Sequence, residues 1–242
     1  ECFTELVEME SEALARQLIQ GTPKRPDSLE KYLAPSRYAI PPLPNTFFTR
    51  DATMCLNDRM IIGSMAYRAR AAEALLLKAV FKYHPDVQSN GFYFDGTANP
   101  DSEVTIEGGD LLVVREDLVV IGYSERTSVA GIDRLMRAIA SQGPVTDFIV
   151  VEIPKTRATI HLDMIFTIVD RDRCVVFPPL ITGNERSRTF HCGFGRGEGA
   201  RIEEFPDVLS ALRAQGVELE PIACGGPDSF HQEREQWGSG AN

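Results

Sequence analysis

The chain has 242 residues, of which 43% are hydrophobic and 25% are charged, a balance typical of a globular protein and unlike a disordered chain. Its formal net charge of −10 leaves no excess of Lys and Arg to neutralise phosphates, so we expect neither a nucleic acid nor an anionic membrane as a partner. No apolar run approaches the roughly 20 residues that span a bilayer. The first residues lack the pattern of a signal peptide, which predicts a cytoplasmic protein.

Residues 1–40 are predicted to form a small helical segment followed by a linker. Leu and Ile recur at helical spacing over 5–20, and the turn residues that begin at Gly21 end this pattern. A second short helix is expected over 27–34. The prolines between 40 and 44 fix their own φ and keep each preceding residue out of the helical region, so the chain there is extended. We therefore place a domain boundary near residue 40 and assign 41–242 to the domain that carries the chemistry.

Residues 41–242 repeat one order of predicted elements: strand, strand, helix, strand. The expected elements are 46–56, 60–62, 66–82 and 91–94 in the first unit, 107–114, 118–122, 129–141 and 148–153 in the second, and 161–169, 173–177, 206–215 and 217–223 in the third. A long loop is expected at 182–200, and Ser128 and Gly143 are the expected N-cap and stop of the second helix. Three such units make an arc, because a ring without exposed strand edges needs more of them.

Polar residues that do not belong in half-buried strands fall at the head of each unit's first strand. They are Asp51, Glu107 and the pair His161 and Asp163, at intervals of 56 and 54 residues. Equivalent positions in successive units face one central axis, so these side chains are expected to converge there. Carboxylates brought together repel unless a cation lies among them. One His and acids spread over three units suit a guanidinium better than a metal, since two carboxylates can grip its planar fork of N–H donors.

The local spacing of these motifs adds further expectations. In His161-Leu-Asp163 the two polar side chains would share one face of a strand while Leu162 faces the core. Gly108-Gly109 predicts a bulge or a close approach of the backbone to a ligand beside Glu107. Each motif alone is more typical of a strand end, a turn or a hydrogen-bonded pair, and only their joint occurrence favours a function. The glycine-rich run 193–199 lacks the pattern of a phosphate-binding loop and is expected to be flexible.

Five motifs, taken in this order, resemble those of the arginine deiminase family. They are Pro44-Asn-Thr-Phe-Phe-Thr-Arg-Asp51, Glu107-Gly-Gly-Asp110, Ser124-Glu-Arg-Thr127, His161-Leu-Asp163, and Cys224-Gly-Gly together with Glu233-Arg-Glu-Gln-Trp237. The resemblance runs from about residue 35 to the last residue. It implies the pentein fold, an α/β propeller of five ββαβ units around a pseudo-fivefold axis, of which about three are expected here. Residues 1–34 resemble the tail of the helical domain that the family inserts into the propeller.

The resemblance implies an enzyme that hydrolyses L-arginine to L-citrulline and ammonia through a cysteine thiolate, without a cofactor and without a metal. By motif match, Asp51 and Asp163 hold the guanidinium and His161 is the general acid and base. Glu107 assists in binding and in stabilising charge.

The resemblance also implies residues that bind the rest of the substrate. Arg70 and Arg126 match the two arginines that bind the substrate carboxylate, and each lies 19 residues after its acid. The alternative for Arg70 is a solvated arginine at the start of a helix. Asn45, Phe48 and Asp110 match further positions of the pocket.

The chain departs from the family at the nucleophile. The family's nucleophilic cysteine lies close to its C-terminus, beyond the segment that ends here at Trp237, and none of the five cysteines of this chain matches it. Their odd number and irregular spacing predict reduced thiols that act as small buried apolar residues. We therefore expect this chain alone to be inactive, because the thiolate is the reactive species.

Other functions stay open at this point. A protein of the same fold could bind a guanidinium or assemble with partners without catalysis. A related amidinotransferase or amidinohydrolase would use the same acids and His, and the acids of an ordinary α/β domain would only be solvated. The paired Arg70 and Arg126 favour a substrate with a free α-carboxylate, so L-arginine is the expected partner, and a homo-oligomer is also compatible with the sequence.

Overall fold

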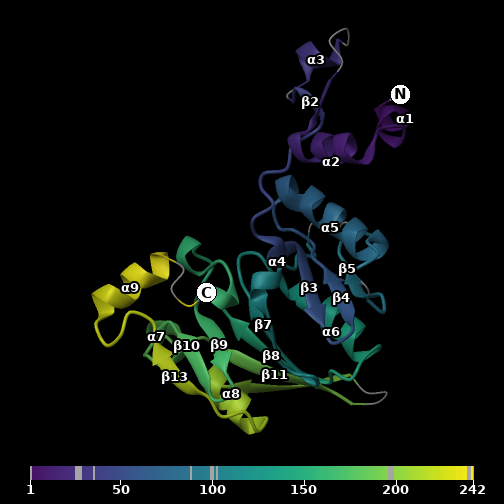
Figure 1. Ribbon diagram of the computed structural model, residues 1–242. Coiled ribbons are helices and arrows are strands. Elements are labelled where there is room, and N and C mark those ends of the chain that lie inside the picture. Colours follow the sequence, from purple (N-terminus) through teal and green to yellow (C-terminus); the bar gives the residue numbers. More distant parts are fainter. Residues whose placement is uncertain are drawn as a thin grey trace.

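The computed structural model describes residues 2–24, 29–34, 36–87, 89–98, 101, 103–195, 199–238 and 241. Figure 1 shows a mixed α/β molecule whose first helices and first strand pair lie at one end, beyond the helix α5 (Ala71–Tyr83). Among the helices of this described part, none combines the length and the apolar character that crossing a bilayer requires.

The N-terminal segment is helical, but it is more broken than the sequence predicts. Its elements are α1 (Cys2–Val7), α2 (Ser11–Gln20), β1 (Thr22–Pro23), α3 (Glu30–Leu33) and β2 (Tyr38–Ile40). The single helix expected over 5–20 is wrong, because Glu10 adopts an extended backbone (φ −58°, ψ 145°) that separates α1 from α2. The helix expected over 27–34 corresponds to α3, and residues 25–28 lie outside the described part. The domain boundary near residue 40 stays a prediction.

The predicted order of strand, strand, helix, strand is confirmed in the first unit. It consists of β3 (Thr53–Leu56), β4 (Arg59–Ile62), α5 and β5 (Phe92–Asp95). β3 pairs with β4 in antiparallel fashion, and β4 pairs with β5 in parallel. Asn57 turns the hairpin with a φ of 52°, a left-handed conformation that Asn tolerates better than most residues.

The same order recurs twice more. The second unit consists of β6 (Leu111–Arg115), β7 (Leu118–Tyr123), α6 (Val129–Ala140) and β8 (Asp147–Glu152), and the third of β9 (Phe166–Asp170), β10 (Arg173–Val176), α8 (Val208–Ala214) and β13 (Glu220–Ala223). Ser128 is the N-cap of α6, as predicted, and accepts the Gly131 N–H at 3.1 Å. Gly143 closes the last turn of that helix, because its N–H donates to the Ile139 carbonyl at 3.0 Å.

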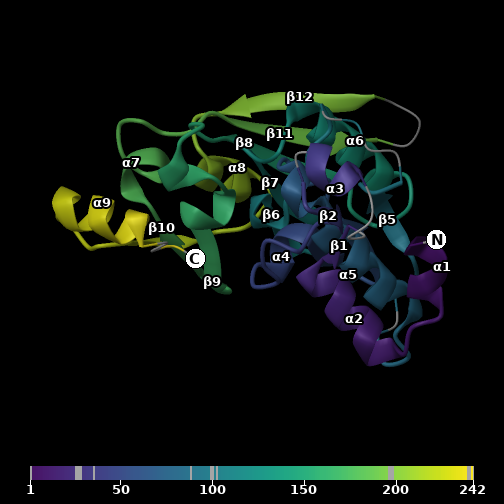
Figure 2. The ribbon, with the colours of Figure 1, turned by 90° about the horizontal axis from the view of Figure 1, so that it is seen from above.

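The long loop expected at 182–200 is wrong. Instead, β11 (Thr189–Phe194) and β12 (Ala200–Phe205) form an antiparallel hairpin after the short helix α7 (Pro178–Ile181). β11 adds to β8, so the sheet of the second unit has the order β12-β11-β8-β7-β6. Figure 2 shows the hairpin along one side of the molecule. β12 has no buried residue, so it lacks the hydrophobic alternation that would have predicted a strand. Residues 196–198 of the loop expected to be flexible lie outside the described part.

The central strands β7 and β8 of the five-stranded sheet are buried on both faces, which places the core on either side of them. Alternate residues of β7 point to opposite faces, as strand geometry requires: Val119 and Ile121 pack with α6, and Leu118 and Val120 pack with the third unit and α8. The N-terminal ends of β3, β6 and β9 meet next to this sheet, and the candidate site lies there. The helix α9 (Ser229–Trp237) follows the third unit.

Candidate active site

The predicted site residues lie in short turns that precede the first strand of each unit, and not in the strands themselves. Asp51 lies in α4 (Thr49–Ala52), Glu107 directly precedes the 3-10 turn η2 (Gly108–Asp110), and His161 directly precedes η4 (Leu162–Met164). The strands were expected to include these residues, but they begin only at Thr53, Leu111 and Phe166. The segments that were predicted to begin the strands are therefore turns.

The turn at η4 also corrects the expected relation between His161 and Asp163. Strand alternation would have placed both side chains on one face, but residues 162–164 form a 3-10 turn after an extended His161 (φ −138°, ψ 162°). Leu162 is fully buried in the core, as expected. A Cβ on Gly109 would overlap the His161 ring, so the glycine pair next to Glu107 provides the space for a close approach of imidazole and backbone.

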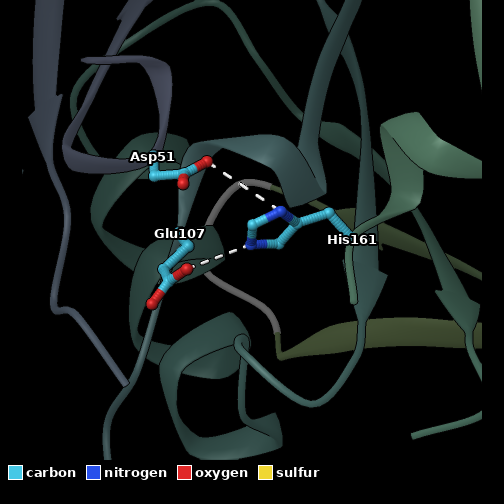
Figure 3. Close-up of side chains that lie close together, drawn as sticks. All are labelled: Asp51, Glu107 and His161. Carbon is cyan, nitrogen blue, oxygen red and sulfur yellow. Dashed lines mark hydrogen bonds and ion pairs between the residues drawn. The ribbon is translucent and has the colours of Figure 1, made fainter. Parts of the chain in front are cut away.

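Asp51, Glu107 and His161 converge although they belong to three different units (Figure 3). His161 Nε2 lies 3.0 Å from Glu107 Oε2, and His161 Nδ1 lies 3.9 Å from Asp51 Oδ1. All three residues are buried, Glu107 completely. The imidazole is thus held between two carboxylates and is largely shielded from bulk water.

The charges of this cluster shift the pKa values of Glu107 and His161 in opposite directions. Burial alone would raise the pKa of Glu107, but the hydrogen bond and charge of His161 and the Ala66 N–H, with Arg126, lower it below its usual range. Burial alone would lower the pKa of His161, but the hydrogen bond to Glu107 and the nearby charges of Asp110, Asp51 and Glu107 raise it above 6.5. The pair therefore favours an imidazolium beside a carboxylate.

Arg70 is not the solvated arginine of the alternative interpretation. Its guanidinium forms a bidentate contact with Glu73 (Nε–Oε1 3.1 Å, Nη2–Oε2 2.9 Å) and donates to Asp51 Oδ2 at 2.7 Å. Its Nη1 lies 3.7 Å from Glu107 Oε2. Burial alone would lower the pKa of Arg70, but the hydrogen bonds to Glu73 and Asp51 raise it. Glu73 was not predicted, although its position three residues after Arg70 at the start of a helix is a usual spacing for an ion pair.

Arg126 approaches the same cluster from the second unit. Its guanidinium carbon lies 4.3 Å from the centre of the Tyr67 ring, and its Nη1 lies 3.4 Å from Glu107 Oε2. Its Nε is buried and has no hydrogen-bond partner among the described residues. Buried donors without partners are uncommon in folded proteins, so this N–H is free for an acceptor that is not part of the described chain.

Asp163 has an unpaired atom of the opposite kind. The residue is buried, its Oδ2 lies 3.9 Å from Arg50 Nε, and its Oδ1 has no hydrogen-bond partner within the described part of the chain. Burial raises the pKa of Asp163, the charges of His161 and Arg50 oppose that rise, and the charge of Asp51 adds to it. Asp163 is thus a buried acceptor whose charged form gains stability if a cation binds.

The three remaining predicted residues do not share one environment. Asn45 is exposed and accepts the Phe47 N–H at 3.1 Å, and Phe48 is 56% exposed with its ring edge-on to Phe47. Asp110 was expected to face the pocket, but it is fully buried and its carboxylate contacts Ser124 and the Leu162 backbone. The structure therefore places Asp110 in the interior, against the backbone of the His161 turn, and leaves Asn45 and Phe48 at the surface.

The cluster offers donors for a cation. Asp51, Glu107 and His161 each supply one ligand atom, and these atoms lie within 4.8 Å of one another, so they could hold a metal ion. The guanidinium groups of Arg70 and Arg126 already contact the two carboxylates of this set. Two carboxylates that grip planar N–H donors match a guanidinium at least as well as a metal.

The cysteines lie outside these contacts in the described part of the chain. Cys174, Cys192 and Cys224 are buried, as predicted, and burial raises the pKa of Cys174 and of Cys192 to about 11. Cys55 is exposed, contrary to the prediction, because it lies on the outward face of β3. It lines a cavity of about 450 Å³ beside the cluster, to which Arg50 also contributes. The side chain of Cys2 is outside the described part.

Comparison with known proteins gives a consistent result. The sequence model of the arginine deiminase family matches residues 4–242. The arginine deiminase of Bacillus cereus (strain ATCC 10987 / NRS 248) is 34% identical over 209 residues, which cover 85% of this chain and 50% of that protein. The arginine deiminase of Lactococcus lactis subsp. lactis (strain IL1403) is 34% identical over 214 residues, which cover 86% of this chain and 51% of that protein. The chain thus spans about half the length of the curated relatives it matches.

A solved structure supports the same fold. The apo structure of ArgZ, an arginine dihydrolase from cyanobacteria, superposes with a TM-score of 0.50 at 14% sequence identity, and the match covers 79% of this chain and 24% of that chain. The three ββαβ units are therefore part of a pentein-type fold, as expected from the sequence.

Proposed function

The chain belongs to the arginine deiminase family, and from this we propose that the whole protein hydrolyses L-arginine to L-citrulline and ammonia. Its curated relatives carry the name arginine deiminase. The proposal extends to the whole protein, since the described chain spans only half of those relatives.

One observation carries the proposal: among the predicted site residues, two buried atoms of opposite polarity have no partner in the described part of the chain. Asp163 Oδ1 is an acceptor and Arg126 Nε is a donor. Arg126 contacts the cluster through Glu107, and Asp163 lies two residues after His161, whose charge acts on it. L-Arginine carries N–H donors at its guanidinium end and carboxylate acceptors at its other end, so it complements both atoms.

The contacts of each side chain suggest how the substrate is held. Asp51 Oδ2 is already bound by Arg70, so the substrate guanidinium would use Asp51 Oδ1 together with Asp163. Arg126 is the better candidate for the α-carboxylate, because the Arg70 guanidinium already donates to Glu73, Asp51 and the Phe48 carbonyl. Arg70 would then orient Asp51, which differs from the role that the sequence resemblance gives it.

The His161–Glu107 pair suits the proton transfers of the reaction. A thiolate attacks the guanidinium carbon, a C–S bond forms, the C–N bond breaks, and His161 gives its proton to the leaving ammonia. Water then attacks the same carbon, a C–O bond forms and His161 takes one proton from the water. The C–S bond breaks, the thiolate leaves, and the remaining hydroxyl proton passes to solvent to give the C=O group of citrulline. The raised pKa of His161 keeps the imidazole protonated for the first step.

The attacking thiolate would come from a part of the protein beyond these 242 residues. A nucleophilic cysteine needs an accessible environment that lowers its pKa. Burial instead raises the pKa of Cys174, Cys192 and Cys224. Cys55 is exposed, but its Sγ lies against Met60 Sδ at 3.4 Å, outside the contacts of the cluster. This chain would therefore supply the binding and proton-transfer groups but not the nucleophile.

The test is to assay the full-length protein that contains this chain for citrulline and ammonia, with L-arginine and with agmatine, which lacks the carboxylate. We expect turnover of L-arginine and little or none of agmatine. Arg126→Ala should lower kcat/KM for L-arginine by about 100-fold, as expected for loss of a charged hydrogen bond. Any residual turnover of agmatine should be the same in the wild type and in Arg126→Ala, because agmatine has no carboxylate for Arg126 to bind. No citrulline from L-arginine, or a preference for agmatine, would defeat the proposal.

A further inference from the structure

The carboxylate of Asp110 lies between the turn that carries His161 and the turn that carries Arg126. Asp110 is fully buried, and among the described residues it forms no ion pair with Lys or Arg. Its Oδ1 accepts the main-chain N–H of Leu162 at 2.9 Å, and its Oδ2 accepts the hydroxyl of Ser124 at 2.6 Å. One carboxylate therefore joins a turn of the second unit to a turn of the third.

In the third unit, Asp110 contacts the backbone of the residue next to His161. Leu162 follows His161 in the chain, and its N–H is the first donor of η4. The Leu162 side chain is fully buried in the core. The backbone of this turn is thus held by the core on one side and by Asp110 on the other, which leaves His161 little freedom to move relative to Glu107.

In the second unit, Ser124 connects Asp110 to the backbone of Arg126. The Ser124 oxygen accepts the N–H groups of Arg126 at 3.0 Å and of Thr127 at 3.2 Å. A serine hydroxyl has one hydrogen and two lone pairs, so it can accept twice only when its hydrogen points elsewhere, and here it points to Asp110. The Thr127 hydroxyl in turn accepts the Glu107 N–H at 3.1 Å. The network therefore extends to Glu107, the residue that contacts the imidazole of His161.

Two glycines allow the carboxylate and the imidazole to pack closely against the backbone. A Cβ on Gly122 would overlap Asp110 Oδ1 and contact the Leu162 side chain. A Cβ on Gly109 would overlap the His161 ring. Only glycine at these two positions lets the carboxylate and the imidazole approach the backbone this closely.

We propose that Asp110 is a positioning residue for the reaction proposed above: by clamping the His161 turn to the Arg126 turn, it fixes the contact between His161 and Glu107, and it does not touch the substrate. This inference rests on the proposed function. It also replaces the pocket role that the sequence resemblance gives to Asp110. A displacement of about 1 Å at a catalytic group can lower a rate about 100-fold, so a clamp of this kind matters for catalysis as well as for folding.

The experiment compares two variants of Asp110 in the full-length protein. Asp110→Ala removes both acceptors and is expected to lower kcat by about 100-fold. Asp110→Asn keeps an acceptor for the Leu162 N–H and should retain more activity than Asp110→Ala. Asn removes the negative charge that Asp110 carries above its raised pKa, while Asp51, Glu107 and Asp163 stay in place. The limb of the kcat profile that reports His161 should therefore move to lower pH.

Asp207→Ala is the matched control. Asp207 is a buried carboxylate that caps α8, accepting the Ser210 N–H at 2.7 Å and contacting Arg186, and it has no contact with the cluster. Its variant should lose stability with kcat unchanged when both variants are assayed below their unfolding temperatures. If Asp110→Ala lowers kcat no more than Asp207→Ala does, the positioning role is wrong while the proposed function stands.

Hydrogen exchange of a peptide that contains Leu162 gives a readout that does not depend on turnover. Exchange should be faster in Asp110→Ala than in the wild type and close to the wild type in Asp110→Asn. If the wild type makes no citrulline, the proposed function fails, and this exchange pattern still decides whether the clamp exists. Equal exchange in all three proteins overturns the clamp.

Discussion

The identity and spacing of single residues predicted much of the site. Asp51, Glu107 and His161 recur at nearly equal intervals, and the structure places them in contact. The spacing could not predict which buried groups contact the site residues or support the turns that carry them. Glu73 binds Arg70, and Asp110 supports the His161 turn, because these contacts depend on how close the turns pack and on which carboxylates lose their water.

Gly109→Ala tests the packing of the imidazole at the scale of one residue. An added Cβ would overlap the His161 ring, and the backbone of Gly109 has an ordinary conformation, so the effect is steric. The ring or the backbone of Gly109 must shift, which disturbs the contact of His161 with Glu107, and kcat of the full-length protein should fall by about 100-fold. Gly238→Ala is the control, because its Cβ would make only ordinary contacts. Equal kcat values for the two variants would show that His161 has room to move.

At the scale of the elements, hydrophobic periodicity predicted the helices and strands that bury a full face. The helix α6 was predicted almost to its ends, since Ile132, Leu135 and Ile139 lie on one buried face and Ser128 caps it. The hairpin β11–β12 was missed, because its outer strand buries nothing and its turn is rich in glycine. The site turns were assigned to strands, because a single helical turn is too short to show a period.

Ser128→Ala tests the predicted cap of α6. The Ser128 hydroxyl accepts the Gly131 N–H and the Thr105 N–H, and donates to the Glu103 carbonyl. Its loss should lower the free energy of unfolding by about 1–2 kcal/mol, measured by chemical denaturation. Ser141→Ala, at the exposed C-terminal end of the same helix, is the control and should change it far less. If both variants have the stability of the wild type, the cap does not hold the helix.

At the scale of the whole molecule, three repeated units were predicted and confirmed, because each unit has the same order of elements. The convergence of their turns follows from this repetition, since equivalent positions of neighbouring units face one another. The five-stranded sheet was not predicted, because the addition of β11 to β8 is a contact between units that local sequence does not encode.

The buried carboxylate of Asp110 should make the stability of the whole molecule depend on pH. Burial raises the pKa of Asp110 from 3.8 to about 7, against the opposing effects of His161 and of its hydrogen bonds. Between these two values the folded state binds more protons than the unfolded state, so the free energy of unfolding falls as the pH rises. Asp110→Asn lacks this titration, and the lower pKa of His161 expected in that variant acts in the same direction.

The measurement is the free energy of unfolding of the full-length wild type and of Asp110→Asn across this pH range. The stability of Asp110→Asn relative to the wild type should increase steadily from pH 3.8 to about 7 and level off above it. A difference that is independent of pH would mean that the fold does not raise the pKa of Asp110.

The central claim is that turns from three repeated units hold the guanidinium of L-arginine between Asp51 and Asp163. The most direct test is a crystal structure of the full-length His161→Ala variant, which should not turn over, with L-arginine bound. We predict guanidinium nitrogens about 2.8 Å from Asp163 Oδ1, with the carboxylate of the ligand on Arg126 Nε. L-Arginine bound elsewhere, or absent at saturating concentration with Asp163 Oδ1 still unpaired, would contradict the account.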